Sequence, residues 1–340
     1  MNTPSLGTTY LGLPLRNPLV ASAGPLSQTV EGIRALADGG VGAVVLYSMF
    51  EEQLRREAAR DAELEELHAE AYAESLSYFP SVVNADNGVG AAYLNLIERG
   101  ASAIDVPLIA SLNGASSGGW TSFARQMADA GAAALELNIY FVPGDVHTPG
   151  RSVEDRHVVI VAAVKDAVDI PVAVKLSPYF SSFGEFALRL DEVGVDGLVL
   201  FNRFLQPDID IESVSVEPRV ELSHPAEGKL PRTWIAALRG QVRASLAATS
   251  GVETADDVVR YLLAGADVVM TTSALVRHGT QHSARLLSGL RSWLTRKGFA
   301  DVDDARGLLA VPAGAEANGY ARAGYVAALE RAKSTYGSLH

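Results

Sequence analysis

The sequence predicts an α/β protein built as a (β/α)8 TIM barrel, and three observations carry this prediction. Short apolar runs alternate with helix-periodic segments through about the first 280 residues. Eight such runs are apolar on both faces, as in parallel strands that are covered on both sides. No Gly-x-Gly-x-x-Gly pattern follows the first run, which argues against the main alternative, an open doubly wound sheet.

The eight candidate strands share one feature, because each apolar run ends at or near a polar residue. They are Pro18–Ser22, Ala43–Ser48, Pro107–Leu112, Ala134–Ile139, Pro171–Ser177, Gly197–Asn202, Arg243–Ser250 and Asp267–Ser273. Helical periodicity fills most of the intervals, at Val30–Asp38, Trp120–Ala130, Val153–Val168, Phe183–Val193, Pro231–Arg239 and Thr254–Ala264. Glycine follows several of these segments, as is common at helix C-termini.

Three segments depart from a minimal barrel. The connection from Met49 to Val106 is a long insertion after strand two, and its charged part, Glu51–Ala73, is typical of an exposed helix. The alternating segment Ile211–Leu222 predicts a small hairpin. After residue 309 an Ala/Pro/Gly-rich stretch leads into a helical pattern over Tyr320–Tyr336. We therefore expect a barrel over residues 1–309 and a helical extension over residues 310–340.

The composition excludes several classes of function. Hydrophobic residues make up 48% and charged residues 20%, which is typical of a globular protein. The formal net charge of −12 disfavours non-specific binding to nucleic acid or anionic membrane. The absence of Cys excludes disulfides, thiolate metal sites and Cys nucleophiles. Since no secretory signal and no uninterrupted membrane-length apolar run is evident, we expect a cytoplasmic protein with a small-molecule substrate.

The carboxyl ends of the predicted strands are unusually polar, and barrel active sites form at these ends. The polar residues there are Ser22, Tyr47, Ser48, Asn113, Asn138, Lys175, Ser177, Asn202, Ser250, Thr272 and Ser273. A single Ser or Thr at a strand end is most simply a residue that meets water. Lys175 differs, because a charge inside an apolar run needs a partner. Asn138 and Asn202 each follow an apolar run, so we expect both to face the same barrel mouth.

The last two loops have the features of a phosphate site. Ser250-Gly251 turns from strand seven into a helix with Thr254 at its N-cap, and Thr272-Ser273 follows strand eight. Barrels commonly bind phosphate at these two loops, through backbone N–H groups and helix N-termini. A phosphorylated cofactor beside a cation is therefore expected. FMN fits, because a Lys near its N1/O2 edge stabilises the charge of the reduced ring. PLP, with Lys175 as Schiff base, is the alternative.

The residues resemble the dihydroorotate dehydrogenase family of FMN-binding barrels, from about Leu11 to about Leu309. The similar pieces are Leu13–Leu19 with Ala21-Ser22-Ala23-Gly24, Ala134–Asn138, Val174–Pro178, Gly197–Arg203, and Ser-Gly-Val-Glu-Thr-Ala-Asp-Asp-Val with Leu-Leu-Ala-Gly-Ala-Asp-Val-Val beyond it. Their order and spacing over most of the chain make a chance resemblance improbable.

The resemblance implies an FMN-dependent oxidoreductase and assigns roles residue by residue. It implies that Ala21, Ser22 and Gly24 contact the flavin, that Lys175 lies at the flavin ring, and that Asn138 and Asn202 hold flavin and substrate. Asn84 lies where a further substrate-binding Asn is expected. Ser250, Gly251, Thr272 and Ser273 correspond to the phosphate loops. The chain is similar to the cytosolic class, whose members are often dimers, so a homodimer is expected.

The chain also departs from the family pattern. The segment that carries the family's Cys or Ser base reads Ile139-Tyr140-Phe141, without Cys or Ser. Tyr47 stands where the family has a Lys, and the phosphate loop has Ser250-Gly251 instead of paired glycines. A neutral Tyr serves better as an acid than as a base, since its ordinary pKa is about 10. Tyr140 and Tyr47 are therefore the candidate proton-transfer groups, ahead of His147 in the same loop.

Three functions remain open from the sequence. The first is an FMN-dependent oxidoreductase acting on dihydroorotate or a related CH–CH substrate. The second is a flavin- or phosphate-binding barrel without dihydroorotate activity, either a subunit of a complex or an ene-reductase-like enzyme. The third is a barrel aldolase with Lys175 as Schiff-base nucleophile, which leaves the other matched segments unexplained.

Overall fold

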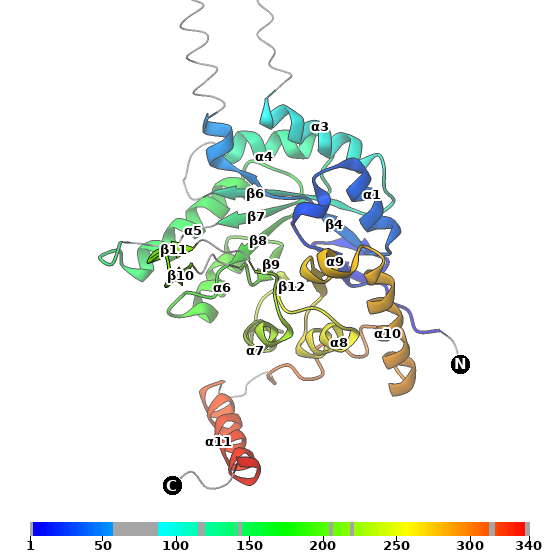
Figure 1. The fold of residues 1–340 in the computed structure, drawn as a ribbon, viewed down its shortest axis with the longest axis vertical. Coiled ribbons are helices and arrows are strands. Elements are labelled where there is room, and N and C mark those ends of the chain that lie inside the picture. The colour runs from blue at the N-terminus through cyan, green and yellow to red at the C-terminus, as the bar shows by residue number, and fades with distance from the viewer. Residues whose placement is uncertain are drawn as a thin grey trace, which may run out of the picture.

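A computed structural model describes residues 3–56, 88–114, 120–139, 141, 145–203, 207–217, 221–312 and 317–336. Within these residues, eight parallel strands close into a barrel (Figure 1). They are β3 (Leu19–Ala21), β4 (Ala43–Val45), β6 (Leu108–Gly114), β7 (Ala134–Ile139), β8 (Val172–Leu176), β9 (Gly197–Leu200), β12 (Ser245–Ala248) and β13 (Val268–Thr271). Each strand pairs with the next, and β13 pairs with β3 to complete the circle. The predicted fold is confirmed.

Helices follow the strands and form the outer layer (Figure 1). They are α1 (Val30–Asp38), α3 (Val89–Ala101), α4 (Trp120–Asp129), α5 (Gly150–Lys165), α6 (Phe183–Glu192), α7 (Lys229–Leu238), α8 (Ala255–Ala264), α9 (Ser273–His278) and α10 (His282–Lys297), with short 3-10 turns η1 (Pro25–Ser27) and η3 (Pro225–Gly228). Local chemistry sets their starts. Thr29 caps α1 by accepting a bond from Gly32 N, and Thr254 with Asp257 forms a capping box on α8.

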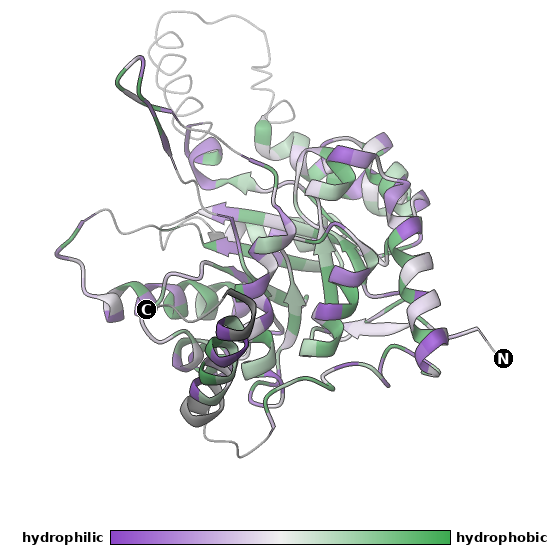
Figure 2. Ribbon diagram, turned by 60° about the horizontal axis from the view of Figure 1, so that its bottom comes forward, coloured by the Kyte–Doolittle hydropathy of each residue, from purple (hydrophilic) through white to green (hydrophobic). Residues whose placement is uncertain are grey.

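Two hydrophobic cores hold the barrel together. The larger core lies between the strands and the helices, and its members include Leu19, Ile33, Leu135 and Phe186. The smaller core fills the barrel interior. Most of the barrel strands are green in Figure 2, which marks hydrophobic residues. The antiparallel pair β1 (Thr8–Tyr10) and β2 (Leu13–Leu15) contributes Tyr10, Leu11 and Leu15 to this inner core. The inner core is therefore apolar wherever it does not meet the carboxyl ends of the strands.

The second predicted strand is interrupted. Ala43–Ser48 was expected to be one strand, but β4 ends at Val45 and pairing to β6 resumes only at β5 (Met49–Phe50). Leu46 still donates to the carbonyl of Ile109, but Tyr47 and Ser48 leave the ladder, and the hydroxyl of Tyr93 takes their place against Ser111 of β6. The local sequence does not indicate this gap, because the side chain that fills it comes from α3, within the long connection after strand two.

The insertion, the hairpin and the C-terminal helix lie outside the eight strand–helix units. Residues 51–56 are helical, and Glu51 is buried and paired with Arg55, unlike the exposed helix face expected there; the rest of the predicted Glu51–Ala73 helix lies outside the described residues. The hairpin consists of β10 (Asp208–Asp210) and β11 (Ser215–Glu217), shifted toward the N-terminus of the predicted segment. Helix α11 (Ala317–Tyr336) stands apart from the barrel (Figure 1).

Candidate functional site

Parallel pairing brings the carboxyl ends of all eight barrel strands to one end of the molecule. Asn113, Asn138 and Lys175 lie within the last residues of their strands, while Ser22, Asn202 and Thr272 follow theirs directly or within two residues. The side chains of Ser22, Asn113, Asn138 and Lys175 are buried, although all are polar. A buried polar group is stable only when it has a partner, so the partners of these side chains define the site.

Lys175 is held by an ion pair inside the barrel. Its Nζ lies 3.3 Å from Oε1 of Glu136 and 3.3 Å from Oγ of Ser22. Lys175 is 7% exposed and Glu136 is 1% exposed. The sequence required a partner for Lys175 but did not identify it. Glu136 lies two residues before Asn138 in β7, and the period of two that makes Ala134 and Asn138 face inward was the available signal.

Asn138 and Asn202 lie close enough to hydrogen bond. The side-chain amide of Asn202 donates to Oδ1 of Asn138 at 2.9 Å. The backbone N–H of Asn202 donates to the carbonyl of Leu176 at 2.7 Å, which fixes the position of the residue after β9. Each amide keeps further donor or acceptor capacity, since an Asn side chain offers two donors and two acceptor lone pairs.

Tyr47 and Ser48 lie where the second strand leaves the ladder. The hydroxyl of Tyr93 is 2.9 Å from the carbonyl of Tyr47, and the two rings pack edge to face with centroids 5.1 Å apart. Oγ of Ser48 and Oγ of Ser111 are 2.8 Å apart. Burial raises the pKa of Tyr47 above its ordinary value. Tyr47 is therefore neutral at physiological pH, where it can give a proton but has no phenolate with which to take one.

The loops after β12 and β13 meet the segment before α7. The hydroxyl of Ser223 donates to Oγ of Ser273 at 3.0 Å, and the backbone N–H of Ser223 lies at the same distance from that atom. The backbone N–H of Gly251 donates to Ser223 Oγ at 3.3 Å. Hydroxyls and amide donors thus gather at the two loops that the sequence indicated for phosphate. Ser223 was not predicted to belong to this cluster, because the β10–β11 hairpin separates it in sequence from the preceding barrel strand, β9.

These loops are packed too closely for larger side chains. A Cβ on Gly251, whose φ is +66°, would lie 2.7 Å from the carbonyl oxygen of His224. A Cβ on Gly24 would lie 2.5 Å from Cγ2 of Thr272, whose hydroxyl donates to the carbonyl of Ser22 at 2.7 Å. The first loop and the last loop of the barrel therefore touch through Gly24 and Thr272. Ala21, the last residue of β3, is buried directly before them.

Arg277 of α9 fastens the same loops from outside. Its guanidinium donates to the carbonyls of Leu222 and Ser223, at 3.0 and 2.9 Å, and to the carboxylate of Glu253 at 2.7 Å. One side chain thus ties the loop after β12 to the segment that carries Ser223. Arg277 could not be singled out from the sequence, because basic residues are common at helix C-termini.

Two sequence-predicted residues, Tyr140 and Asn84, lie outside the described residues. Two others, His147 and Ser250, make their contacts outside this cluster. His147 is exposed, and its backbone N–H donates to Asp145. Ser250 has a φ of +77°, and its hydroxyl donates to the carbonyl of Phe201 at 3.3 Å. Within the described residues no group of three or more acidic or His side chains could hold a metal ion, and no helix is long and apolar enough to cross a membrane.

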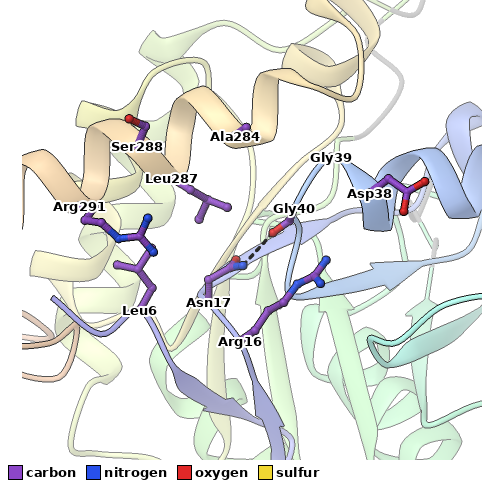
Figure 3. A pocket seen from close by; sticks show the side chains of 10 residues that line it. All are labelled: Leu6, Arg16, Asn17, Asp38, Gly39, Gly40, Ala284, Leu287, Ser288 and Arg291. Atoms are coloured by element: carbon purple, nitrogen blue, oxygen red, sulfur yellow. Dashed lines mark hydrogen bonds between the residues drawn. The ribbon is translucent and has the colours of Figure 1, made fainter. Parts of the chain in front are cut away.

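A pocket of about 450 Å³ lies at the opposite end of the barrel. Asn17, directly before β3, lines it together with the end of α1 and one face of α10 (Figure 3). Asn17 donates to the carbonyl of Gly40 at 2.8 Å, and Arg16 donates to the carbonyl of Ala37 at 2.6 Å. These contacts cap the C-terminus of α1. The pocket is therefore remote from Lys175, and its described polar contacts are structural.

Comparison with known proteins identifies the family to which the chain belongs. The family model for dihydroorotate dehydrogenase matches residues 5–294. The chain is 29% identical over 318 residues to the dihydroorotate dehydrogenase B (NAD(+)) catalytic subunit of Methanothermobacter thermautotrophicus, covering 89% of this chain and 98% of that protein. It is 26% identical over 313 residues to the protein of the same name from Thermoplasma acidophilum, with the same coverage of both. The chain belongs to the dihydroorotate dehydrogenase family.

Proposed function

We propose that the chain is an FMN-dependent oxidoreductase that transfers hydride between the flavin and the CH–CH bond of dihydroorotate or a related substrate. The observation that carries the proposal is the buried Lys175 at the carboxyl end of β8, held between Ser22 and Glu136. A cation kept in an apolar barrel at such a cost is typical of a functional site.

The residues fit FMN at both ends of that cofactor. The hydroxyl of Ser273 accepts both bonds from Ser223 and keeps its own O–H as a donor for a phosphate. Lys175 and the Asn138–Asn202 pair offer a cation, donors and acceptors for the polar edge of the ring and for substrate. Bound FMN supplies the hydride chemistry. Lys175 stabilises negative charge beside the reduced ring, and the asparagines orient the groups that react.

The proton is handled by the chain. Oxidising dihydroorotate to orotate removes a hydride from C6, which carries both electrons to the flavin, and a proton from C5, which a base must take. General base catalysis is worth about 10²–10⁴-fold. A neutral Tyr can give this proton in the reverse direction, the reduction of the double bond, and we propose Tyr140 and Tyr47 as the proton-transfer groups and Asn84 as a further substrate ligand. Because the pKa of Tyr47 is raised, the neutral hydroxyl favours proton donation, which suits reduction of a double bond.

A second candidate follows from the same residues. Tyr47 and Tyr140 replace the Lys and the Cys or Ser of the family pattern. The second candidate is a flavin- or phosphate-binding barrel without dihydroorotate activity, acting as a subunit or as an ene-reductase-like enzyme on another substrate. It would retain the Lys175 site but would not act on dihydroorotate.

An absorption spectrum of the purified chain, followed by anaerobic addition of dihydroorotate, tests the proposal. We expect flavin bands that bleach on addition. Bands that persist favour a flavin-binding barrel with another substrate. A protein without bands that takes up no added FMN overturns the first proposal and favours a phosphate-binding barrel without redox chemistry. Tyr140→Phe should lower turnover by about 10²-fold or more with unchanged FMN content. An unchanged rate removes Tyr140 from proton transfer.

A further inference from the structure

Glu136 is the buried acidic partner of Lys175, and only one of its two carboxylate oxygens contacts the ammonium. It belongs to β7 and is 1% exposed. Its Oε1 pairs with Nζ of Lys175 at 3.3 Å. Its Oε2 is also buried, and among the described residues it has no hydrogen-bond partner. A buried carboxylate normally satisfies both oxygens, so a group with one orphaned oxygen needs an explanation beyond stability.

The surroundings leave the charge of Glu136 poorly screened. Ala134 lies one inward-facing position nearer the amino end of β7, and Ala173 of β8 lies in register with Glu136. Burial, and secondarily the negative charge of Glu136, raises the pKa of Tyr10. The pKa of Tyr93 is raised in the same way, with Glu136 as a minor cause. The carboxylate is therefore close enough to Tyr10, in the inner core, to disfavour ionisation of that side chain.

A stabilising role does not account for the pair. Desolvating two charges often costs as much as their attraction returns, and well-packed apolar residues of similar volume are frequently as stable. Glu136 instead fixes what Lys175 presents to the barrel mouth. With Ser22 on one side and Glu136 on the other, the ammonium is held in one place, and part of its positive potential is cancelled.

We infer that Glu136, through its negative charge behind the ammonium of Lys175, lowers the reduction potential of the bound flavin. The inference rests on the proposed function, because it requires a flavin beside Lys175. Adding electrons to the flavin builds negative charge next to the ammonium. A carboxylate behind the ammonium opposes that build-up, so the enzyme with Glu136 holds a weaker oxidant than the enzyme without it.

The test is the midpoint potential of the FMN-loaded full chain, measured by equilibration with a reference dye during gradual reduction. It is made at the same pH for all variants. Glu136→Gln should shift the midpoint potential to more positive values. Glu136→Asp keeps the negative charge, so its potential should lie close to that of the wild type. Glu154→Gln is the matched control. Glu154 is also buried, but it pairs with Arg151 and Arg189 on α5 and α6, outside the barrel. The flavin of the Glu154→Gln variant should therefore have the wild-type midpoint potential.

A Glu136→Gln potential equal to or below the wild-type value overturns the inference. If Glu136→Gln does not fold, the comparison is made between Lys175→Gln and the double variant Lys175→Gln/Glu136→Gln. There the carboxylate acts alone, and its removal should again raise the potential; equal potentials overturn the inference. A wild-type chain that takes up no FMN overturns the proposed function, and this inference with it, and is distinguished by the absorption spectrum alone.

Discussion

The hydroxyl of Tyr93 makes hydrogen bonds to the backbone where the pairing of the second barrel strand with β6 is interrupted. It accepts from the backbone N–H of Ser111 at 3.1 Å and lies 3.0 and 2.9 Å from the carbonyls of Ser111 and Tyr47. Tyr93 itself is fully buried, and burial raises its pKa well above the ordinary value. The hydroxyl is therefore a permanent donor that holds the loop carrying Tyr47 against β6.

Removing this hydroxyl tests its importance. Tyr93→Phe keeps the ring and leaves the backbone N–H of Ser111 without its acceptor inside the barrel wall. A buried polar group without a partner costs about 1–3 kcal/mol, so we expect the free energy of unfolding to fall by that amount in urea denaturation. The control is Tyr179→Phe, since Tyr179 is 60% exposed and should lose far less. Equal losses in the two variants would show that the Tyr93 hydroxyl contributes little.

At the scale of elements, periodicity located the strands because parallel barrel strands are buried on both faces. All eight predicted runs overlap an observed strand, and α1 has the predicted bounds. Helices α3 and α10 were not predicted, because α3 lies within a long insertion of mixed character and α10 follows the last strand–helix unit. The site was only partly predictable. Lys175 stands out in an apolar run, whereas Glu136 and Ser223 gain meaning only when the barrel closes.

Helix α5 carries a buried His that makes stability depend on pH. Nδ1 of His157 lies 2.7 Å from the carbonyl of Val153, and the ring packs edge to face on Phe180 and Phe186. Burial lowers the pKa of His157, although hydrogen bonds to the carbonyls of Val153 and Ile139 oppose the shift. Because Ile139 ends β7, this helix supports the strand that bears Glu136 and Asn138.

The lowered pKa sets the sign of the effect. In the unfolded chain His157 binds a proton below about pH 6.5, but the folded protein binds it only at lower pH. The free energy of unfolding should therefore fall as the pH decreases through about 6.5. His157→Asn keeps a donor and cannot titrate. We expect the stability difference between wild type and this variant to narrow between about pH 7.5 and 5.5. A difference that stays constant over this range contradicts the assignment.

At the scale of the whole molecule, the chain remains tied to the barrel beyond α10. Backbone N–H groups of Gly307, Leu309 and Val311 donate to carbonyls of α8 and α7, each at 2.9 Å. The boundary that the sequence predicts between barrel and C-terminal extension, at residue 309, therefore lies within this hydrogen-bonded segment. We propose that the barrel unit extends through residue 312, and that α11 is a separate extension whose Tyr325, Val326 and Leu329 are exposed.

The hairpin β10–β11 supports the proposed homodimer. Ile209 and Val216 face each other across its two strands, Ile211 and Val214 lie in its turn, and each is at least 68% exposed. Aliphatic side chains gathered on one projecting hairpin are typical of a contact surface. Burying one such side chain contributes about 1.5–3 kcal/mol.

Light scattering on the full chain should therefore give twice the mass of one chain, and Val216→Glu should weaken the dimer about tenfold or more. Val159→Glu is the matched control, because Val159 is 59% exposed on α5, away from the hairpin. If both variants keep the wild-type mass at low protein concentration, the hairpin is not the dimer surface. If both dissociate equally, added charge rather than the hairpin controls assembly. Dissociation of Val216→Glu alone, with FMN retained, places the subunit contact on the hairpin and separates it from the Lys175 site.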